Sequence, residues 1–364
     1  MRKKLILAVS VSIFTGLSSL SSLSVFAQSQ THQQKVALAI GKPIVSDNLT
    51  VFLIRGNGDL KNQSPMTLQE ALSKNKVRVH ETGDVNTLQI ENSSDAAVFI
   101  QSGDIVKGGR QDRTMQYDMI LPPHSGMLPL PAFCVEHGRW SQRAAERADR
   151  FSHSDNALVG KDLKLAARQV GSQQQVWDKV AEGTGQMYHQ ALASLPAAPP
   201  AVSSGGLAAL GPVEARLAQS NPTGSLEIAL ENKNVTAAAD VQVKKLLHVV
   251  DGDNTIVGFA FAINGKLNSA DVYGSNQLFL KMWPKELKSA VVEAIENRND
   301  KIKSPSIATG DVEKVLYVGK PQQSKEHSVN TRTKLIDQET KDSLMFQTID
   351  KSSGAVVHQS YFVK

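Results

Sequence analysis

The sequence predicts an α+β protein in which early and late strands form a mainly antiparallel β-sheet around a central helical section. Short β-rich runs separated by Gly/Asp and Asn/Ser turns fill residues 77–101, a spacing typical of antiparallel strands. Helical patterns follow between residues 141 and 250, and the chain ends in further β-rich runs. Because strands and helices do not alternate regularly, a parallel βαβ topology is not expected.

The first half of the chain contains local signals for both element types. Residues 49–54 (LTVFLI) predict a buried strand. Thr67 with Glu70 three residues later predicts a helix over 67–75 that begins with a capping box. Within residues 113–121 the odd positions from 115 to 121 are apolar or aromatic while positions 114, 116 and 118 are polar, and this period of two predicts a half-buried strand.

Two prolines shape the expectation for the segment that follows. Pro129 and Pro131 interrupt an extended run at 127–135, and proline cannot donate to a β-ladder. We therefore expect an extended arm that is not a central strand and that forms an irregular hairpin with 113–121.

The second half predicts mixed elements around one clear hairpin. Asn264-Gly265, the favoured pair for a type I′ turn, separates β-rich runs at 255–263 and 266–273. The other expected elements are a short charged helix at 141–150, a helix at 172–183, a helix at 225–250 broken near 232–234, a helix at 276–297 with a turn at Pro284, and strands at 329–336, 344–350 and 355–363.

The N-terminus predicts export. Three basic residues precede an apolar run at 5–14, and Val25-Phe26-Ala27 suits signal peptidase, so we expect a signal peptide at 1–27. A retained N-terminal anchor is the alternative. No later window approaches the roughly 18 apolar residues of a membrane helix, so no other span is expected. The mature chain is divided into a tail at 28–40 and a single α+β domain at 41–364, although two domains remain an alternative.

Composition excludes some classes of function. Removing the three basic residues of the leader lowers the formal net charge from +5 to +2. The remaining basic residues are spread among acids and form no concentrated basic face, so nucleic-acid binding is not expected. The single cysteine leaves no internal disulfide, so an ordinary core must hold the exported domain. The Pro/Ala/Gly/Ser-rich stretch at 195–212 predicts a loop.

Residues 101–140 contain the densest mixture of charged, glycine and aromatic residues, and we place the candidate site there. Two strings in it, 103–113 and 134–140, are expected to form a polar pocket or groove. The candidate ligand-binding residues are Asp104, Lys107, Gly108, Gly109, Arg110, Gln111, Asp112, Arg113, Cys134, Glu136, Arg139 and Trp140.

Each candidate also has a structural interpretation. Glycines 108 and 109 allow a tight turn whose N–H groups, with Lys107 and Arg110, can hold an anion; alternatively the turn contains only solvated basic residues and internal Asp–Arg pairs. Arg139 beside Trp140 can bind a carboxylate, phosphate or sugar, or can form a salt bridge with Glu136 under a buried ring.

Cysteine and histidine chemistry is less favoured. Cys134 lies between Phe133 and Val135, which favours a buried small side chain over a nucleophile. Cys134-x-x-His137 has no second pair and the histidines are scattered, so no metal ligands and no cofactor are predicted.

Several strings resemble one bacterial and archaeal family. GDIVKGGRQDRTMQYDMILPPHSG, PLPAFCVEHGRW, QQQVWDKVA and GFAFAINGKLNSADVYGS are similar to the ARG and Rhodanese-Phosphatase-superfamily-associated Protein domain, from about residue 40 to the end. Its name implies genomic association with ADP-ribosylglycohydrolases and rhodanese or phosphatase proteins, and hence nucleotide- or phosphate-related chemistry. Many relatives have Asn where this chain has Asp112, and the resemblance transfers no catalytic residue.

Two classes of function follow from these observations. The first is an exported protein that binds a small anionic ligand containing phosphate or ribose, with a hydrolase or transferase acting on such a ligand as its enzymatic form. The second is a non-catalytic envelope module that binds a protein partner.

Overall fold

The computed structural model describes residues 38–60, 64–139, 141, 143, 150–154, 157–193, 221–299, 306–317 and 320–364. The expected signal peptide, most of the tail, the 195–212 loop and most of the expected helix at 141–150 lie outside these residues. Val36–Lys364 form one compact unit. Within the described part of the chain, no helix combines the length and apolar character needed to cross a membrane.

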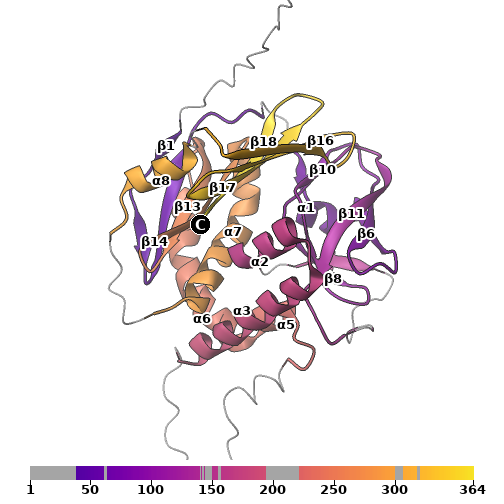
Figure 1. The fold of residues 1–364 in the computed structure, drawn as a ribbon, viewed down its shortest axis with the longest axis horizontal. Helices are drawn as coiled ribbons and strands as arrows, with labels where there is room; N and C mark the ends of the chain where they lie inside the picture. The colour runs from indigo at the N-terminus through magenta and orange to yellow at the C-terminus, as the bar shows by residue number, and fades with distance from the viewer. Residues whose placement is uncertain are drawn as a thin grey trace, which may run out of the picture. The chain divides into compact units, whose positions relative to one another are not determined.

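The largest sheet joins early and late strands, as predicted. β3 pairs antiparallel with β13, so N-terminal strands continue a sheet otherwise built from the C-terminal third (Figure 1). The turn at Asn264 (φ 50°) and Gly265 (φ 72°) links β13 to β14, which confirms the predicted hairpin. The strands are β1 (Ala39–Ile40), β2 (Ile44–Ser46), β3 (Leu49–Arg55), β13 (Ile256–Ile263), β14 (Lys266–Tyr273), β15 (Gln323–Ser328), β16 (Thr333–Glu339), β17 (Ser343–Asp350) and β18 (Val356–Val363).

Residues between β3 and the helical section form two smaller sheets. The six-stranded sheet runs β12-β8-β9-β11-β6-β5, and the three-stranded sheet runs β10-β7-β4. Their strands are β4 (Met66–Thr67), β5 (Val77–Glu81), β6 (Thr87–Asn92), β7 (Val98–Ile100), β8 (Ile105–Gly108), β9 (Arg113–Met115), β10 (Met119–Leu121), β11 (Gly126–Cys134) and β12 (Phe151–His153).

The single half-buried strand expected over 113–121 is wrong. The chain bends after Met115, so β9 pairs with β11 while β10 pairs with β7 in another sheet. Thr114 and Asp118, which the alternation placed on the solvent face, are buried at 0% and 4% exposure. The pattern misleads because protein covers both faces of this segment, so its polar positions bond internally.

The expectation for 127–135 is confirmed in part, since residues 132–134 pair antiparallel with 113–115 and the prolines lie where β11 has a partner strand on one side, although β11 as a whole lies between β9 and β6. Residues 126–131 of β11 pair with β6, and residues 132–134 pair with β9. Pro129 and Pro131 therefore lie in the part of the strand that pairs with β6. A strand tolerates proline at a position whose backbone N–H would have no hydrogen-bond partner in a neighbouring strand.

The helices follow their local signals more closely. In α1 (Leu68–Ser73) the N–H of Glu70 donates to Thr67 Oγ1 and the N–H of Thr67 donates to Glu70 Oε2, which confirms the capping box. The predicted break separates α5 (Leu226–Glu231) from α6 (Lys233–Leu246) at Asn232, whose ψ is 130°. The remaining helices are α2 (Lys161–Leu165), the π-helical turn η1 (Ala166–Val170), α3 (Gln173–Ala193), the 3₁₀ turn η2 (Leu247–Val250), α7 (Asn276–Glu296) and α8 (Thr309–Leu316).

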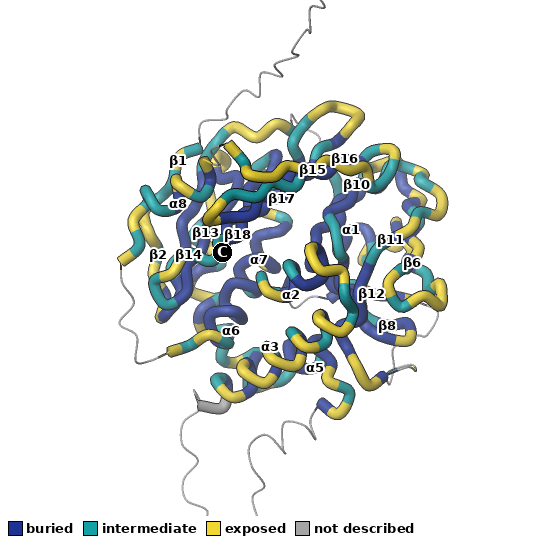
Figure 2. The backbone as a smooth tube through the Cα atoms, in the orientation of Figure 1, coloured by how far each residue is buried: buried dark blue, intermediate teal, exposed yellow. Residues whose placement is uncertain are grey.

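Helix α7 passes through Pro284 without the predicted turn. It packs on one face of the large sheet, where Trp283 and Leu287 join the same apolar cluster as Phe259 of β13. Burial on both sides of Pro284 offsets the lost hydrogen bond. Figure 2 shows α7 buried along most of its length. Polar side chains of α7 are therefore surrounded by protein, which makes their partners informative.

Candidate functional site

The two strings predicted to form the site do meet in space. β8 pairs with β9, and Arg113 of β9 lies opposite Cys134 of β11. The turn between β8 and β9 uses positive φ at Gly108 (117°) and Gly109 (56°), a conformation that favours glycine. A side chain at Gly109 would collide with Glu81 and Phe151. The two glycines therefore allow the turn to pack closely against neighbouring residues.

A buried ion network lies beneath this turn. Arg139 Nε donates to Glu136 Oε2 (2.7 Å), and Arg139 Nη2 donates to Asp112 Oδ1 (3.1 Å). The other oxygen of Glu136 accepts from Thr223 Oγ1 (2.7 Å). Asp112 and Glu136 are fully buried, and Arg139 is 6% exposed. Burial raises the pKa of Asp112 to about 7, a shift that the charges of Arg143 and Arg139 oppose.

Most of the remaining candidate side chains form hydrogen bonds or ion pairs with other residues of the protein. Asp104 pairs with Lys285, Lys107 with Glu231 (2.8 Å), and Arg113 donates to the carbonyl of Gln111 (3.1 Å). Gln111 Nε2 donates to the carbonyl of Glu136 (2.9 Å).

Three candidates differ from that pattern. The side chain of Arg110 is exposed, while its N–H donates to Glu81 Oε1 (2.9 Å). Cys134 is buried, and burial raises the pKa of its thiol to about 11, so the thiolate needed for nucleophilic attack is scarce at neutral pH. Trp140 lies outside the described residues.

The ion network also holds one wall of a cavity. Thr223 bonds Glu136, Ser225 Oγ lies 3.5 Å from Asp112 Oδ2, and the N–H of Leu226 donates to the carbonyl of Val135 (3.0 Å). Ser225 caps α5, and Leu226 on α5 lines the cavity. The predicted residues thus position the cavity wall.

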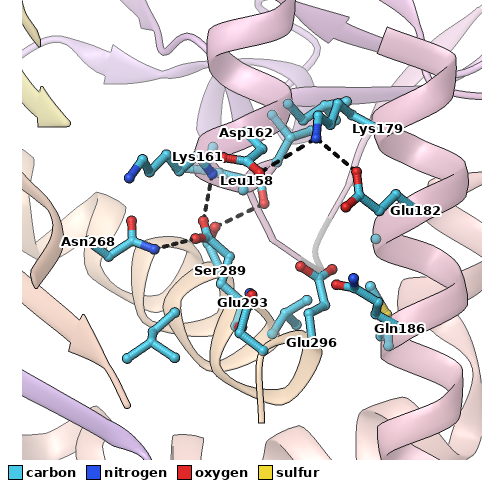
Figure 3. A pocket seen from close by; sticks show the side chains of 18 of the residues that line it. Leu158, Lys161, Asp162, Lys179, Glu182, Gln186, Asn268, Ser289, Glu293 and Glu296 are labelled. Carbon is cyan, nitrogen blue, oxygen red and sulfur yellow. Dashed lines mark hydrogen bonds and ion pairs between the residues drawn. The ribbon is translucent and has the colours of Figure 1, made fainter. Parts of the chain in front are cut away.

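The cavity has a volume of about 700 Å³ and lies among α2, α3, α5, α7 and the β13–β14 turn (Figure 3). Its size is in the range of small-molecule sites. Sequence inspection missed it because its lining comes from segments far apart in the chain. Its charged and amide side chains include Lys161, Asp162, Lys179, Glu182, Gln186, Lys266, Asn268, Glu293 and Glu296.

Most of these side chains are paired. Glu293 Oε1 accepts from the N–H of Lys161 (2.7 Å), and its Oε2 accepts from Asn268 Nδ2 (2.9 Å). Lys179 Nζ lies 2.8 Å from Glu182 and 3.8 Å from Asp162. Burial raises the pKa of Glu293. One side of the cavity therefore has fixed charges that neutralise one another.

Three polar side chains of the cavity have no such partner. No hydrogen bond or ion pair joins Glu296, Gln186 or Lys266 through its side chain to another described residue. In Figure 3 Glu296 and Gln186 lie beside each other at the open space. Burial, followed by the charges of Glu293, Asp162 and Glu182, raises the pKa of Glu296 well above its ordinary value. The carboxyl of Glu296 therefore binds its proton more tightly than an ordinary glutamate does.

A second set of polar side chains lies near Glu286, which precedes Glu296 on α7. Glu286, Ser289, Glu293 and Glu296 recur at spacings of three and four residues and so share one face of the helix. Glu286 accepts from Tyr273 Oη (2.6 Å), near a buried histidine.

That histidine, His358, lies between two carboxylates. Its Nδ1 is 2.7 Å from Asp118 Oδ2, and its Nε2 is 3.2 Å from Asp271 Oδ1. Burial lowers the pKa of His358, but Asp118 and Asp271 outweigh burial and raise it to about 9. Among the described residues, Asp271, Glu286 and His358 form a group that could hold a metal ion.

Comparison with known proteins identifies a family and no characterised relative. The model of the ARG and Rhodanese-Phosphatase-superfamily-associated Protein domain matches residues 37–362. No curated protein and no solved structure shows significant similarity to this chain.

Proposed function

The chain belongs to the ARG and Rhodanese-Phosphatase-superfamily-associated Protein domain family, and since that name gives no activity, we propose a function from the cavity. The protein is exported and binds a small anionic ligand that contains ribose or phosphate in the cavity between α2, α3 and α7. The two strings at 103–113 and 134–140 support the cavity wall through α5.

The unpartnered side chains of the cavity carry this proposal. Glu296 is partly buried without a hydrogen-bond partner, an uncommon state for a polar group that a ligand would relieve. Gln186 and Lys266 line the same cavity with exposed side chains that can reach a ligand. The carboxyl of Glu296 and the amide of Gln186 suit hydroxyl groups such as those of ribose. The ammonium of Lys266 suits a phosphate.

A thermal-shift screen of residues 28–364 tests the proposal. The ligands are nucleotides, ADP-ribose, phosphosugars and neutral sugars. Ligand binding raises the apparent stability, by about 2.7 kcal/mol at one hundred times Kd. We expect a phosphate- or ribose-containing compound to raise Tm in the wild type, with a smaller shift in Glu296→Gln and in Lys266→Ala.

Matched controls separate cavity effects from surface effects. Glu313→Gln on α8 and Lys325→Ala on β15 remove the same charges at exposed positions away from the cavity lining. Both should keep the full ligand shift. Equal shifts in all four variants would contradict the cavity as the site, and no shift with any compound would favour the envelope-module alternative.

An enzymatic form of this function is favoured by one observation. Glu296 lines the cavity with a pKa raised by burial, and a carboxyl that keeps its proton to higher pH is suited to donate it to a leaving group. A hydrolase or transferase would therefore use Glu296 as its acid. Any ligand found in the screen should be incubated with the protein and product formation followed; loss of turnover in Glu296→Gln with binding partly retained would support catalysis.

Export is supported by the leader at 1–27. Expression of the full chain in a bacterial host, followed by fractionation and N-terminal sequencing, should give a periplasmic or secreted protein that starts at Gln28. A cytoplasmic chain with its leader intact would contradict export, and a membrane-bound chain with an intact leader would indicate a retained anchor.

A further inference from the structure

Three buried side chains bring metal-ligand atoms together inside the molecule. Asp271 on β14, Glu286 on α7 and His358 on β18 offer two carboxylate oxygens and an imidazole nitrogen within 4.8 Å of one another. Asp271 and Glu286 are 2% exposed and His358 is fully buried. Burial of ionisable groups is costly unless they are paired or bind a metal, and in this structure Asp271 is paired with His358 while Glu286 accepts hydrogen bonds from Tyr273 Oη and Gln101 Nε2.

Each of the three groups is held by a second hydrogen bond. Asp118 Oδ2 binds Nδ1 of His358 (2.7 Å), which directs Nε2 toward Asp271. Ser360 Oγ donates to Asp271 Oδ1 (2.6 Å), and Tyr273 Oη donates to Glu286 Oε1 (2.6 Å). Bonds of this kind orient metal ligands, and carboxylate–histidine pairs are a common example.

Lys164 on α2 supplies an independent observation. Its side chain is 7% exposed, yet no hydrogen bond or ion pair within 4.0 Å joins its ammonium group to another described residue. The charges that act on it most strongly are those of Glu286 and then Asp271. The ammonium group therefore adds a positive charge near these carboxylates without a hydrogen bond or ion pair to either of them.

Charge balance indicates what fits there. Asp118, Asp271 and Glu286 are three carboxylates, while the nearby Lys285 is already paired with Asp104. A dication together with Lys164 would neutralise the three carboxylates while His358 stays neutral.

We propose that Asp271, Glu286 and His358 bind one divalent transition-metal ion. A mixed set of imidazole and carboxylate ligands suits zinc, manganese or cobalt better than the all-oxygen sites of calcium. Metal–ligand bonds of about 2.0–2.2 Å require ligand atoms roughly 3–4 Å apart, so the three side chains close inward and His358 Nε2 turns from Asp271 to the ion.

The charge of one side chain acts both on this group and on the cavity lining. The charge of Lys164 interacts with Glu286 of the buried group and also with Glu293, which lines the cavity. The site lies beside the proposed ligand cavity, and the two proposals can fail separately because the metal test uses the ion alone.

The experiment is titration of chelator-treated mature protein, residues 28–364, with Co²⁺, Zn²⁺ and Mn²⁺. Calorimetry gives the stoichiometry, and the visible spectrum of Co²⁺ reports the coordination. We expect one ion per chain and the absorption bands of a nitrogen- and oxygen-bound cobalt. Asp118→Asn should weaken binding by about 10–100-fold, as loss of a supporting bond does, and Glu286→Gln should weaken it more.

Controls keep the outcome decisive if a variant misfolds. His248→Gln changes an exposed histidine and should bind the ion like the wild type. Circular dichroism verifies that Glu286→Gln is folded. The proposal is overturned if the wild type gives no heat and no cobalt spectrum, or if folded Glu286→Gln binds the ion with unchanged affinity.

Discussion

The ion network of Arg139 and the cavity of Glu296 use the same residue types in opposite ways. In the network, Arg139 bonds two fully buried carboxylates. In the cavity, Glu296 and Lys266 have no side-chain partner among the described residues. Buried pairs hold a structure in place, whereas unpaired groups at an accessible cavity are available to a ligand. We therefore expect the first region to contribute stability and the second to contribute ligand binding.

Arg139→Ala tests the structural half of the comparison and should have the largest effect. It leaves Glu136 buried without an arginine and Asp112 with Arg143 alone, and removing one partner of a buried ion pair costs about 3–5 kcal/mol. Urea denaturation of residues 28–364 measures the change in unfolding free energy. A loss below about 1 kcal/mol with ligand binding abolished would instead make Arg139 a ligand-binding residue.

Gly109→Ala should have the next largest effect, because it disturbs the turn above the same network. Alanine at φ 56° is strained, and its Cβ would meet Glu81 and Phe151. Strain and overpacking of this kind cost about 1–3 kcal/mol each. Gly83→Ala is the matched control, since Gly83 has φ 86° with no atom within 4 Å of its Cβ position. Equal losses in the two variants would show that backbone strain alone matters at Gly109.

Glu296→Gln tests the other half and should stabilise the protein modestly. The folded state raises the pKa of Glu296 above the unfolded value of about 4.3, so the folded chain binds the proton more tightly. Stability from this group is therefore highest below pH 4 and falls as pH rises toward the folded-state pKa. Glutamine removes that loss. We expect Tm of Glu296→Gln to exceed that of the wild type at pH 8 and to match it near pH 4; the reverse order would contradict the assignment.

Local interactions explain which parts of the fold were predictable. Thr67 with Glu70 and Asn264 with Gly265 define their elements through groups a few residues apart, so the sequence predicts a helix start and a hairpin. The position of β11 between two other strands could not be predicted, because the effect of Pro129 depends on where neighbouring strands pair. The same holds for the bend after Met115, which depends on two sheets formed elsewhere.

The candidate site, like the fold, could be predicted from the sequence only in part. The sequence correctly brought 103–113 and 134–140 together, but pairing of Asp112 with Arg139 was one of two alternatives that only geometry separates. In the sequence Glu296 looks like an ordinary residue on the polar face of a helix, so no local motif distinguishes it as a binding residue. His358 and Glu286 lie 72 positions apart in the chain and are brought together by the packing of α7 on the large sheet. Local spacing rules for metal ligands cannot detect such a group.

Arg110→Ala should have the smallest effect and sharpens the boundary between the two regions. Arg110 belongs to the predicted site, yet its side chain is exposed and its fixed contact is the backbone N–H to Glu81, which alanine retains. Exposed substitutions usually change stability by less than about 0.5 kcal/mol. Thermal shifts with and without phosphate- or ribose-containing ligands should therefore match the wild type. A lost ligand shift with unchanged Tm would extend the binding site from the cavity to the turn, because only a direct contact of the guanidinium with the ligand gives that combination.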